Sequence, residues 1–398
     1  MSTLLLSFAW AVPLSREQSI SVFDRGIESG LLSTMDGKFG EDWASAEDFL
    51  AHYTEKPRRC VLSGDPLSLE FGESTLPCRV IVTWHPAYHS MTFIVTTPIT
   101  GGPDLAIAVL QSLQGRVSSG ALRGRYRDET HSSAKESVTA AFAELTAGSE
   151  TEELHRKGWC VEVRGYDGHP PGRTVEADPR PFYGLATSDE GWRFVPRDVA
   201  REALGQQWGT RTFVAAYAMA NSIVCLNSKG SEYTDHQREL ALTLFGETEP
   251  YFEIDSPVGG LDHGMLFILE RVLIRMALAD QWLHRAQEEL ARSLSNPDGK
   301  KAANRKRRLL RGSLDDLLEM LNSVLPPEID SLERRLVTTM GVERIIQQLD
   351  RQAEAMDDET RYSYESVVSA RVTRLTVVTV ILTVVTIILG VLQVLVSL

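Results

Sequence analysis

The pattern of hydrophobic and polar positions divides the chain into three regions. Over residues 1–258, short runs rich in β-branched and aromatic residues alternate with helical patterns. Residues 259–372 have helical periodicity only, and residues 373–398 are almost entirely aliphatic. Strands separated by helices are typical of α/β and α+β domains. The pattern therefore predicts an α/β (or α+β) domain, then a long helical hairpin and stalk, then one C-terminal transmembrane helix.

The first region contains several runs that favour strands. The apolar run at residues 1–17 has no basic residue before Arg16, so we expect a strand here and not a signal peptide. Further strands are expected at residues 79–99, as a joined pair, and at residues 159–167 and 212–227. Helices are expected at residues 104–115, 132–148 and 234–246. The proline-rich stretch 168–184 predicts a loop.

The third region has the length and composition of a membrane span. The 24 residues from Leu375 to Leu398 carry no charge, and a helix of that length spans the hydrocarbon layer of about 30 Å. The residues that are not Val, Leu or Ile follow one another at spacings of 3, 4, 3, 4, 3 and 4, which is an uninterrupted heptad stripe. This polar seam consists of Thr376, Thr379, Thr383, Thr386, Gly390, Gln393 and Ser397.

A polar seam on a single membrane helix predicts self-association. Small and hydroxylated residues at helix contacts let backbones approach, and a strict seven-residue period favours a left-handed bundle. The seam is interpreted either as a packed interface or as the lining of a polar conduit. Chance patterning is the third alternative, since Thr and Ser also satisfy themselves on the preceding turn.

The charges that flank the span predict its orientation. Arg371 and Arg374 come just before the uncharged segment, so the positive-inside rule places the N-terminal region in the cytoplasm and the C-terminus outside it. The expected protein is single-pass and tail-anchored in the plasma or inner membrane, with lipid as one partner.

The middle region predicts three helices. The first covers residues 265–294, the second 301–324, and the third is expected to run unbroken from Glu328 through the membrane. The third carries its own heptad of apolar residues, which is expected to pack on the hairpin or on a neighbouring stalk. This stalk stripe comprises Val342, Ile346, Leu349, Ala353 and Met356.

A basic run at residues 300–308 lies between the first two helices. If the hairpin turns at Pro326, this run is level with acidic residues of the stalk, which suggests a charge match within or between subunits. A solvated basic turn is the equal alternative, because exposed ion pairs contribute only about 0–1 kcal/mol. The residues concerned are Lys300, Lys301 and Arg305 on one side and Asp350, Glu354, Asp357 and Asp358 on the other.

This organisation resembles that of the CorA-type magnesium and cobalt transporters. The resemblance covers residues 261–398 by architecture and polar seam, and the N-terminal domain by class only. It implies a homopentamer whose membrane helix lines a pore, with a divalent cation as the substrate. The family's Gly-Met-Asn signature and its second membrane helix do not occur here, since Gly390 is followed by "VLQVLVSL". The assembly is therefore carried over from the family, and the magnesium is not.

Composition excludes some function classes. The net charge of −13 argues against nucleic acid as a general partner. Four separated cysteines (Cys60, Cys78, Cys160 and Cys225) are expected to be reduced core thiols.

Signals for catalysis or cofactors are weak. His85 and His89 lie in a strand context that does not suit a helical zinc motif, so neither metal nor cofactor is predicted. Four arginines in a glycine-rich stretch are expected either to receive an acidic ligand or to lie in a solvated loop. They are Arg116, Arg123, Arg125 and Arg127.

Two functions follow that are not enzymatic, and an unrecognised enzyme on a tail anchor is the third alternative. One is a CorA-like, homo-oligomeric membrane protein that conducts ions under the control of a cytoplasmic sensing domain. The other is a membrane-tethered cytoplasmic binding or scaffold protein with no transport activity.

Overall fold

The computed structural model describes most of the chain: residues 3–14, 16–34, 58–64, 66–85, 88, 90–116, 122–147, 154, 156–164, 171–208, 214–227, 260–295 and 327–397. The chain forms two compact units. Unit 1 comprises Met1–Gln281 and Met320–Ile345, and unit 2 comprises Trp282–Glu319 and Ile346–Leu398. The sheet and the first half of the first long helix thus belong to the same unit, whereas the sequence pattern separates them at residue 258.

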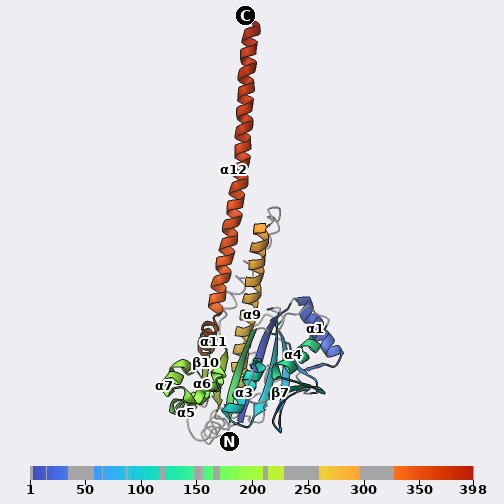
Figure 1. The fold of residues 1–398 in the computed structure, drawn as a ribbon, viewed down its shortest axis with the longest axis vertical. Helices are drawn as coiled ribbons and strands as arrows, with labels where there is room; N and C mark the ends of the chain where they lie inside the picture. The colour runs from blue at the N-terminus through green and yellow to red at the C-terminus, as the bar shows by residue number, and fades with distance from the viewer. Residues whose placement is uncertain are drawn as a thin grey trace, which may run out of the picture. The chain divides into compact units, whose positions relative to one another are not determined.

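Unit 1 is built on an 11-stranded sheet in the order β10-β11-β9-β1-β6-β5-β4-β7-β8, in which β3 also pairs with β5 and β2 pairs with β3. Figure 1 draws this sheet with β10 and β7 labelled. All the pairs are antiparallel except β11 with β9, which is parallel. The strands are β1 Thr3–Pro13, β2 Leu32–Thr34, β3 Arg58–Leu62, β4 Leu67–Phe71, β5 Ser74–His85, β6 Ser90–Ile99, β7 Leu122–Tyr126, β8 Glu129–His131, β9 Arg156–Arg164, β10 Val214–Met219 and β11 Ser222–Asn227.

The described strands confirm the strand predictions of the sequence. The N-terminal apolar run is β1, residues 79–99 supply β6 and most of β5, and residues 212–227 form the β10–β11 hairpin. The α/β class is confirmed as well. The helix expected at residues 234–246 lies outside the described residues.

The two faces of the sheet have different chemistry. Alternate residues of β1 from Leu4 to Val12 enter the main apolar core, where Trp10 contacts Phe93 and Phe93 contacts Phe142 of a covering helix. The intervening β1 residues, which include Ser7, Ala9 and Ala11, are also buried but face the other way. The sheet is therefore covered on both sides, with an aromatic core on one face and small, polar and aliphatic residues, such as Ile81 and Ile94, on the other.

The helices of the N-terminal region follow local sequence rules. They are α1 Arg16–Glu28, α3 Pro103–Leu113, α4 Ala134–Leu145, α5 Pro171–Ala177, α6 Arg180–Thr187 and α7 Arg197–Leu204, with a short 3-10 helix, η2, at Trp192–Phe194. Both described helix predictions, α3 and α4, are confirmed. Ser133 caps α4 by accepting a hydrogen bond from the Glu136 backbone N–H, as its sequence favours.

The prediction of a loop at residues 168–184 is wrong, because α5 lies within it and α6 begins in it. Pro171 is the first residue of α5, and Pro181 lies in the first turn of α6. A proline in a first turn lacks only an N–H that has no partner inside the helix, so these prolines start helices here instead of breaking them. Gly184 then allows α6 to approach Trp192, since a Cβ on it would lie 2.7 Å from the Trp192 Cβ.

Among the described residues, three helices follow the sheet: α9 Gly260–Ser295, α11 Pro327–Thr339 and α12 Val342–Ser397. The first prediction, a helix at 265–294, is confirmed, and the second helix lies outside the described residues. The expectation of an unbroken third helix is wrong, because Gly341 has φ of 72° and separates α11 from α12. A left-handed glycine ends a helix because it accepts this conformation without a Cβ penalty. The hairpin and stalk arrangement thus stays a prediction.

Candidate functional site

The sheet face of small and polar residues carries a buried carboxylate from α9. Gly158 of β9 is tightly covered by this helix, since a Cβ there would lie 2.9 Å from Leu269 Cδ1. The next residue, Glu270, has a fully buried side chain. The two terminal guanidinium nitrogens of Arg59, Nη1 and Nη2, donate to its carboxylate at 3.1 and 2.7 Å. The pair joins residues that are 211 positions apart in the sequence.

Strand register explains why polar residues gather around Glu270. Arg59 of β3 is aligned with Thr83 of β5, Thr83 with Thr92 of β6, and Thr92 with Ala11 of β1. Residues aligned across neighbouring strands share one face of a sheet. Arg59 also donates to the Thr83 hydroxyl, and the Thr92 hydroxyl donates to Glu270. One row of strand residues therefore supplies most of the described partners of this carboxylate.

His85 completes the cluster and helps to keep Glu270 charged. Its Nε2 lies 3.8 Å from a Glu270 oxygen and 3.5 Å from the Thr92 hydroxyl. Burial by itself raises the pKa of the Glu270 carboxyl, but the charge of Arg59, its hydrogen bonds and the nearby His85 imidazole outweigh it. The net result is a pKa far below the usual range of a glutamate. The carboxylate is therefore ionised at neutral pH and forms a buried ion pair with Arg59, which joins the sheet to α9.

A second buried charge cluster joins α9 to α11. Glu333 of α11 lies 3.3 Å from Arg271 Nε and also pairs with Arg275, one helical turn further along α9. All three side chains are at most 5% exposed. The helix α9 is thus held by charge to the sheet on one side and to α11 on another. The chain then leads through Gly341 into α12, which begins in unit 1.

Sequence reasoning did not single out these residues. A usable signal was present, because Glu270, Arg271 and Arg275 stand in the otherwise apolar stretch "MLFILERVLIRMALA". Charged residues inside a helix that is apolar all round are rarely buried unless they are paired. Their partners, however, lie far away in the sequence.

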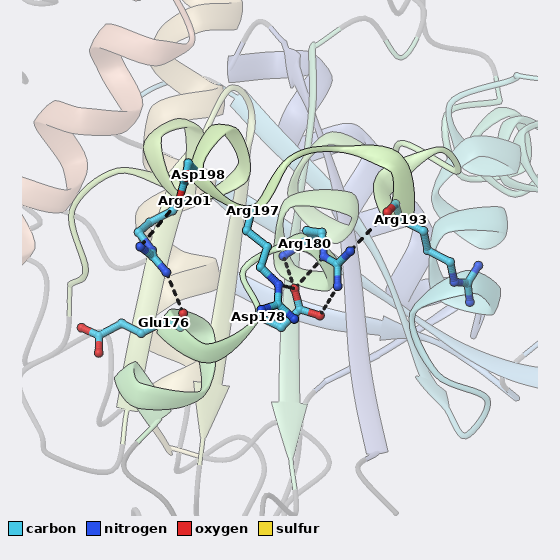
Figure 2. A network of polar contacts seen from close by, with 7 residues as sticks. All are labelled: Glu176, Asp178, Arg180, Arg193, Arg197, Asp198 and Arg201. Carbon is cyan, nitrogen blue, oxygen red and sulfur yellow. Dashed lines mark hydrogen bonds and ion pairs between the residues drawn. The ribbon is translucent and has the colours of Figure 1, made fainter.

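A third polar network lies on the surface formed by α5, α6 and α7 (Figure 2). Asp178 accepts from Arg180 at 2.8 and 3.0 Å and lies 3.8 Å from Arg197 Nε. The hydrogen bond from Arg180 lowers the pKa of Asp178. The side chains of Arg197 and Asp178 are 60% and 37% exposed, so each pair contributes at most about 1 kcal/mol.

Two further arginines of this surface are also engaged. Arg201 donates to the Glu176 carbonyl at 2.9 Å, and Arg193 pairs with Asp104. The contacts of these four arginines therefore fasten the short helices together.

The apolar part of α12 carries the predicted seam. Val368–Leu389 is a 22-residue segment of mean hydropathy 2.3, and every residue of it is exposed in the single chain. At about 1.5 Å per residue it measures about 33 Å, so it is long and apolar enough to cross a membrane.

Each described threonine of the seam donates its hydroxyl to the carbonyl four residues earlier, at 2.8–2.9 Å. They are Thr376, Thr379, Thr383 and Thr386. Gly390, Gln393 and Ser397 lie on the same helix, but their side chains are outside the described set.

The stalk stripe is partly described. Val342, Ile346 and Leu349 are 0%, 8% and 2% exposed, which agrees with a packed face. The side chains of Ala353 and Met356 lie outside the described set.

The predicted charge match is described on one side only. Asp350, Glu354 and Asp358 are exposed on α12, and the side chain of Asp357 is outside the described set. Lys300, Lys301 and Arg305 lie outside the described residues, so the match stays a prediction.

The remaining candidates from the sequence are dispersed. Arg127 pairs with Glu144, and Arg125 donates to the Arg127 carbonyl, whereas Arg116 lies at the end of α3. His89 is outside the described residues, and in the part that is described no three His, Cys, Asp or Glu side chains gather in a metal-binding group. All four cysteines are buried thiols, as predicted.

No family model, curated protein or solved structure matches this chain. Any functional conclusion therefore depends on the residues themselves.

Proposed function

We propose that this protein is a homo-oligomeric membrane protein in which the apolar segment of α12 spans the bilayer and the polar seam is the contact between copies. The observation that carries the proposal is the fully exposed apolar segment with four threonines at spacings of 3, 4 and 3. A lone helix exposes this stripe to lipid, whereas a symmetric assembly buries it. Unit 1 is then the cytoplasmic domain, which binds a ligand and is coupled to the bundle.

The back-bonded threonines support a packed contact. Because each hydroxyl already donates within its own helix, it needs no partner in lipid. The polarity of each threonine therefore does not explain why the four threonines lie on one face of the helix, and their alignment needs another reason. A line of side chains smaller than the surrounding Leu and Ile lets two backbones approach, which is how membrane helices gain packing energy.

Ion conduction, as in the CorA-type proteins that the architecture resembles, is the second candidate. It is favoured by the direction of the same hydrogen bonds, because each hydroxyl gives its hydrogen to the helix and keeps its oxygen lone pairs. Rings of such oxygens in a symmetric bundle are able to replace part of the hydration shell of a cation. Flux through the purified protein in liposomes separates this candidate from a scaffold that only tethers unit 1.

The first prediction concerns the seam. Replacing Thr379, Thr383 and Thr386 together with leucine is expected to shift the assembly toward monomers, because added bulk separates the backbones. A symmetric oligomer repeats this loss of packing in every subunit, so a modest change in one helix has a larger effect on the assembly. The mass of the detergent-solubilised particle measures the effect.

A matched control and a crosslinking test sharpen this prediction. Exchanging Val378 and Val385 for other aliphatic residues should leave the particle mass unchanged. Single cysteines at Thr383 and at Val385 should differ, with only the former joining neighbouring chains. Equal crosslinking at both positions, or crosslinking at Val385 alone, would mean that the stripe is not the contact.

The second prediction concerns orientation. Since Arg371 and Arg374 lie on the N-terminal side of the uncharged segment, a reporter fused at Met1 should be cytoplasmic and one at Leu398 extracytoplasmic. Reporter activity in a bacterial inner membrane gives the answer for both ends. A cytoplasmic signal from both fusions would rule out a single crossing.

A further inference from the structure

Three cations from three elements of unit 1 meet at the C-terminal end of α3. Lys157 of β9 donates from Nζ to the Gln114 carbonyl at 3.2 Å. The side chain of Lys135, on α4, lies over the next residue, Gly115, where a Cβ would be 2.7 Å from its Cδ and 3.6 Å from its Nζ. Arg116 follows directly and is exposed.

Buried hydrogen bonds fix the backbone at the C-terminal end of α3. The first N–H of α4, on Ala134, donates to the Ser112 hydroxyl in the last turn of α3 at 3.0 Å. The Gln114 amide donates to the Ser188 hydroxyl at 2.9 Å, which ties the end of α6 to the same turn. The backbone beneath the three cations is therefore fixed before any ligand binds, which lowers the ordering cost of binding.

The ammonium group of Lys157 lies near two other positive charges. Its pKa is lowered, first by burial and then by the charges of Lys135 and Arg116. Within the described residues, both charges that act on Lys157 are thus positive, and neither Lys135 nor Arg116 has an ion-pair partner there. Glu136, next to Lys135 in the sequence, already accepts from the backbone N–H and the hydroxyl of Ser132.

Many donors are left for a ligand. An ammonium group has three N–H donors, and Lys157 uses one of them on the Gln114 carbonyl. Lys135 and Arg116 add further donors at an exposed rim around a half-buried base. Several charged N–H donors that lie close together match the several oxygens of one phosphate group. Hydrogen bonds between charged groups are about twice as strong as neutral ones.

We propose that Lys135, Lys157 and Arg116 form a binding site for a phosphate-bearing anion. A bound phosphate relieves the repulsion among the three cations and satisfies their donors, so both effects favour binding. The site names the ligand class for the sensing role of unit 1 and rests on the proposed function for that role. Binding itself is independent of membrane assembly.

Calorimetric titration of pyrophosphate into the full chain in phosphatidylcholine nanodiscs, at fixed ionic strength, tests the site. Saturable binding is expected, with the dissociation constant raised at least about tenfold in Lys135→Gln and in Arg116→Gln. Both substitutions are on exposed side chains, so the fold should remain. Arg201→Gln removes one positive charge from α7 and should leave the affinity unchanged. Particle mass, measured on the same samples, reports assembly separately.

Two results would overturn the site: no saturable heat with pyrophosphate, or an equal affinity in the wild type, Lys135→Gln and Arg116→Gln. A particle mass that corresponds to a monomer, together with intact pyrophosphate binding, would count against the proposed assembly and not against the site.

A second arm identifies the source of the phosphate. Nanodiscs that also contain phosphatidylinositol bisphosphate should weaken pyrophosphate binding if a lipid headgroup occupies the site. Unchanged binding assigns the site to a soluble phosphorylated molecule. The same loss of affinity in Lys135→Gln is expected in either case.

Discussion

Replacing Glu270 with glutamine is expected to lower the free energy of unfolding of unit 1 by about 3–5 kcal/mol, the cost of breaking a buried ion pair by removing one partner. The bidentate contact from Arg59 loses its charge complement, while the Arg59 side chain stays only 5% exposed. Urea unfolding of the full chain in mild detergent measures the change. Six of the seven tryptophans of the chain belong to unit 1, so tryptophan fluorescence reports mainly on this unit.

Two variants test the cause. The double substitution Arg59→Met with Glu270→Leu removes both charges of this pair. It is expected to recover most of the lost stability, because neither position then leaves an unpaired charge in the interior. Glu202→Gln, on the exposed side of α7, should change the free energy by less than about 0.5 kcal/mol. A loss below about 1 kcal/mol in Glu270→Gln would mean that water or other groups already screen this pair.

The pH dependence has a defined sign. The pKa of Glu270 is lower in the folded than in the unfolded chain, where it is about 4.3. Its contribution is therefore fully present above the unfolded value and is lost as the pH falls below about 4 toward the folded value. Wild-type stability should accordingly fall more steeply on the acid side than that of Glu270→Gln.

Replacing Glu333 with glutamine is expected to have an effect of similar size, about 3–5 kcal/mol, because one carboxylate serves two guanidinium groups. Arg271 and Arg275 stay at most 5% exposed on α9, so their charges cannot be hydrated without separating α9 from α11. Hydrogen exchange of the α11 amides should therefore accelerate more than exchange in the central strands β1 and β6.

The comparison between the two glutamates is informative. Glu270→Gln should loosen the contact between sheet and helix, whereas Glu333→Gln should loosen α11 and the start of α12. Uniform acceleration across unit 1 in both variants would indicate global destabilisation and no separate coupling role for α11. Glu202→Gln again serves as the unaffected control.

Much of the secondary structure was predictable because its causes are local. Runs rich in β-branched and aromatic residues predict β5 and β6, a short apolar run predicts β1, and Ser133 marks the start of α4. The wrong prediction of a loop at residues 168–184 also had a local cause, since a proline signals either a break or a first turn. The position of Gly341 was visible in the sequence, but a single glycine inside a helical pattern is often tolerated.

The charged clusters depended on tertiary structure. Arg59 meets Glu270 only because β3, β5 and β6 align Arg59, Thr83 and Thr92 in one row, and α9 crosses that face. Lys135 and Lys157 meet only because the start of α4 and β9 both reach the end of α3. Pairing across tens or hundreds of residues follows from strand order and register, which no local pattern encodes.

The sequence by itself determined the apolar segment that is long enough to cross a membrane and its heptad stripe, because composition and helical period are both readable residue by residue. It also determined the α/β class of the N-terminal region, because strand-like and helical patterns are likewise readable along the chain. Only the tertiary structure decided which charges are buried and which remain for a ligand, since burial and pairing are properties of contacts between distant segments.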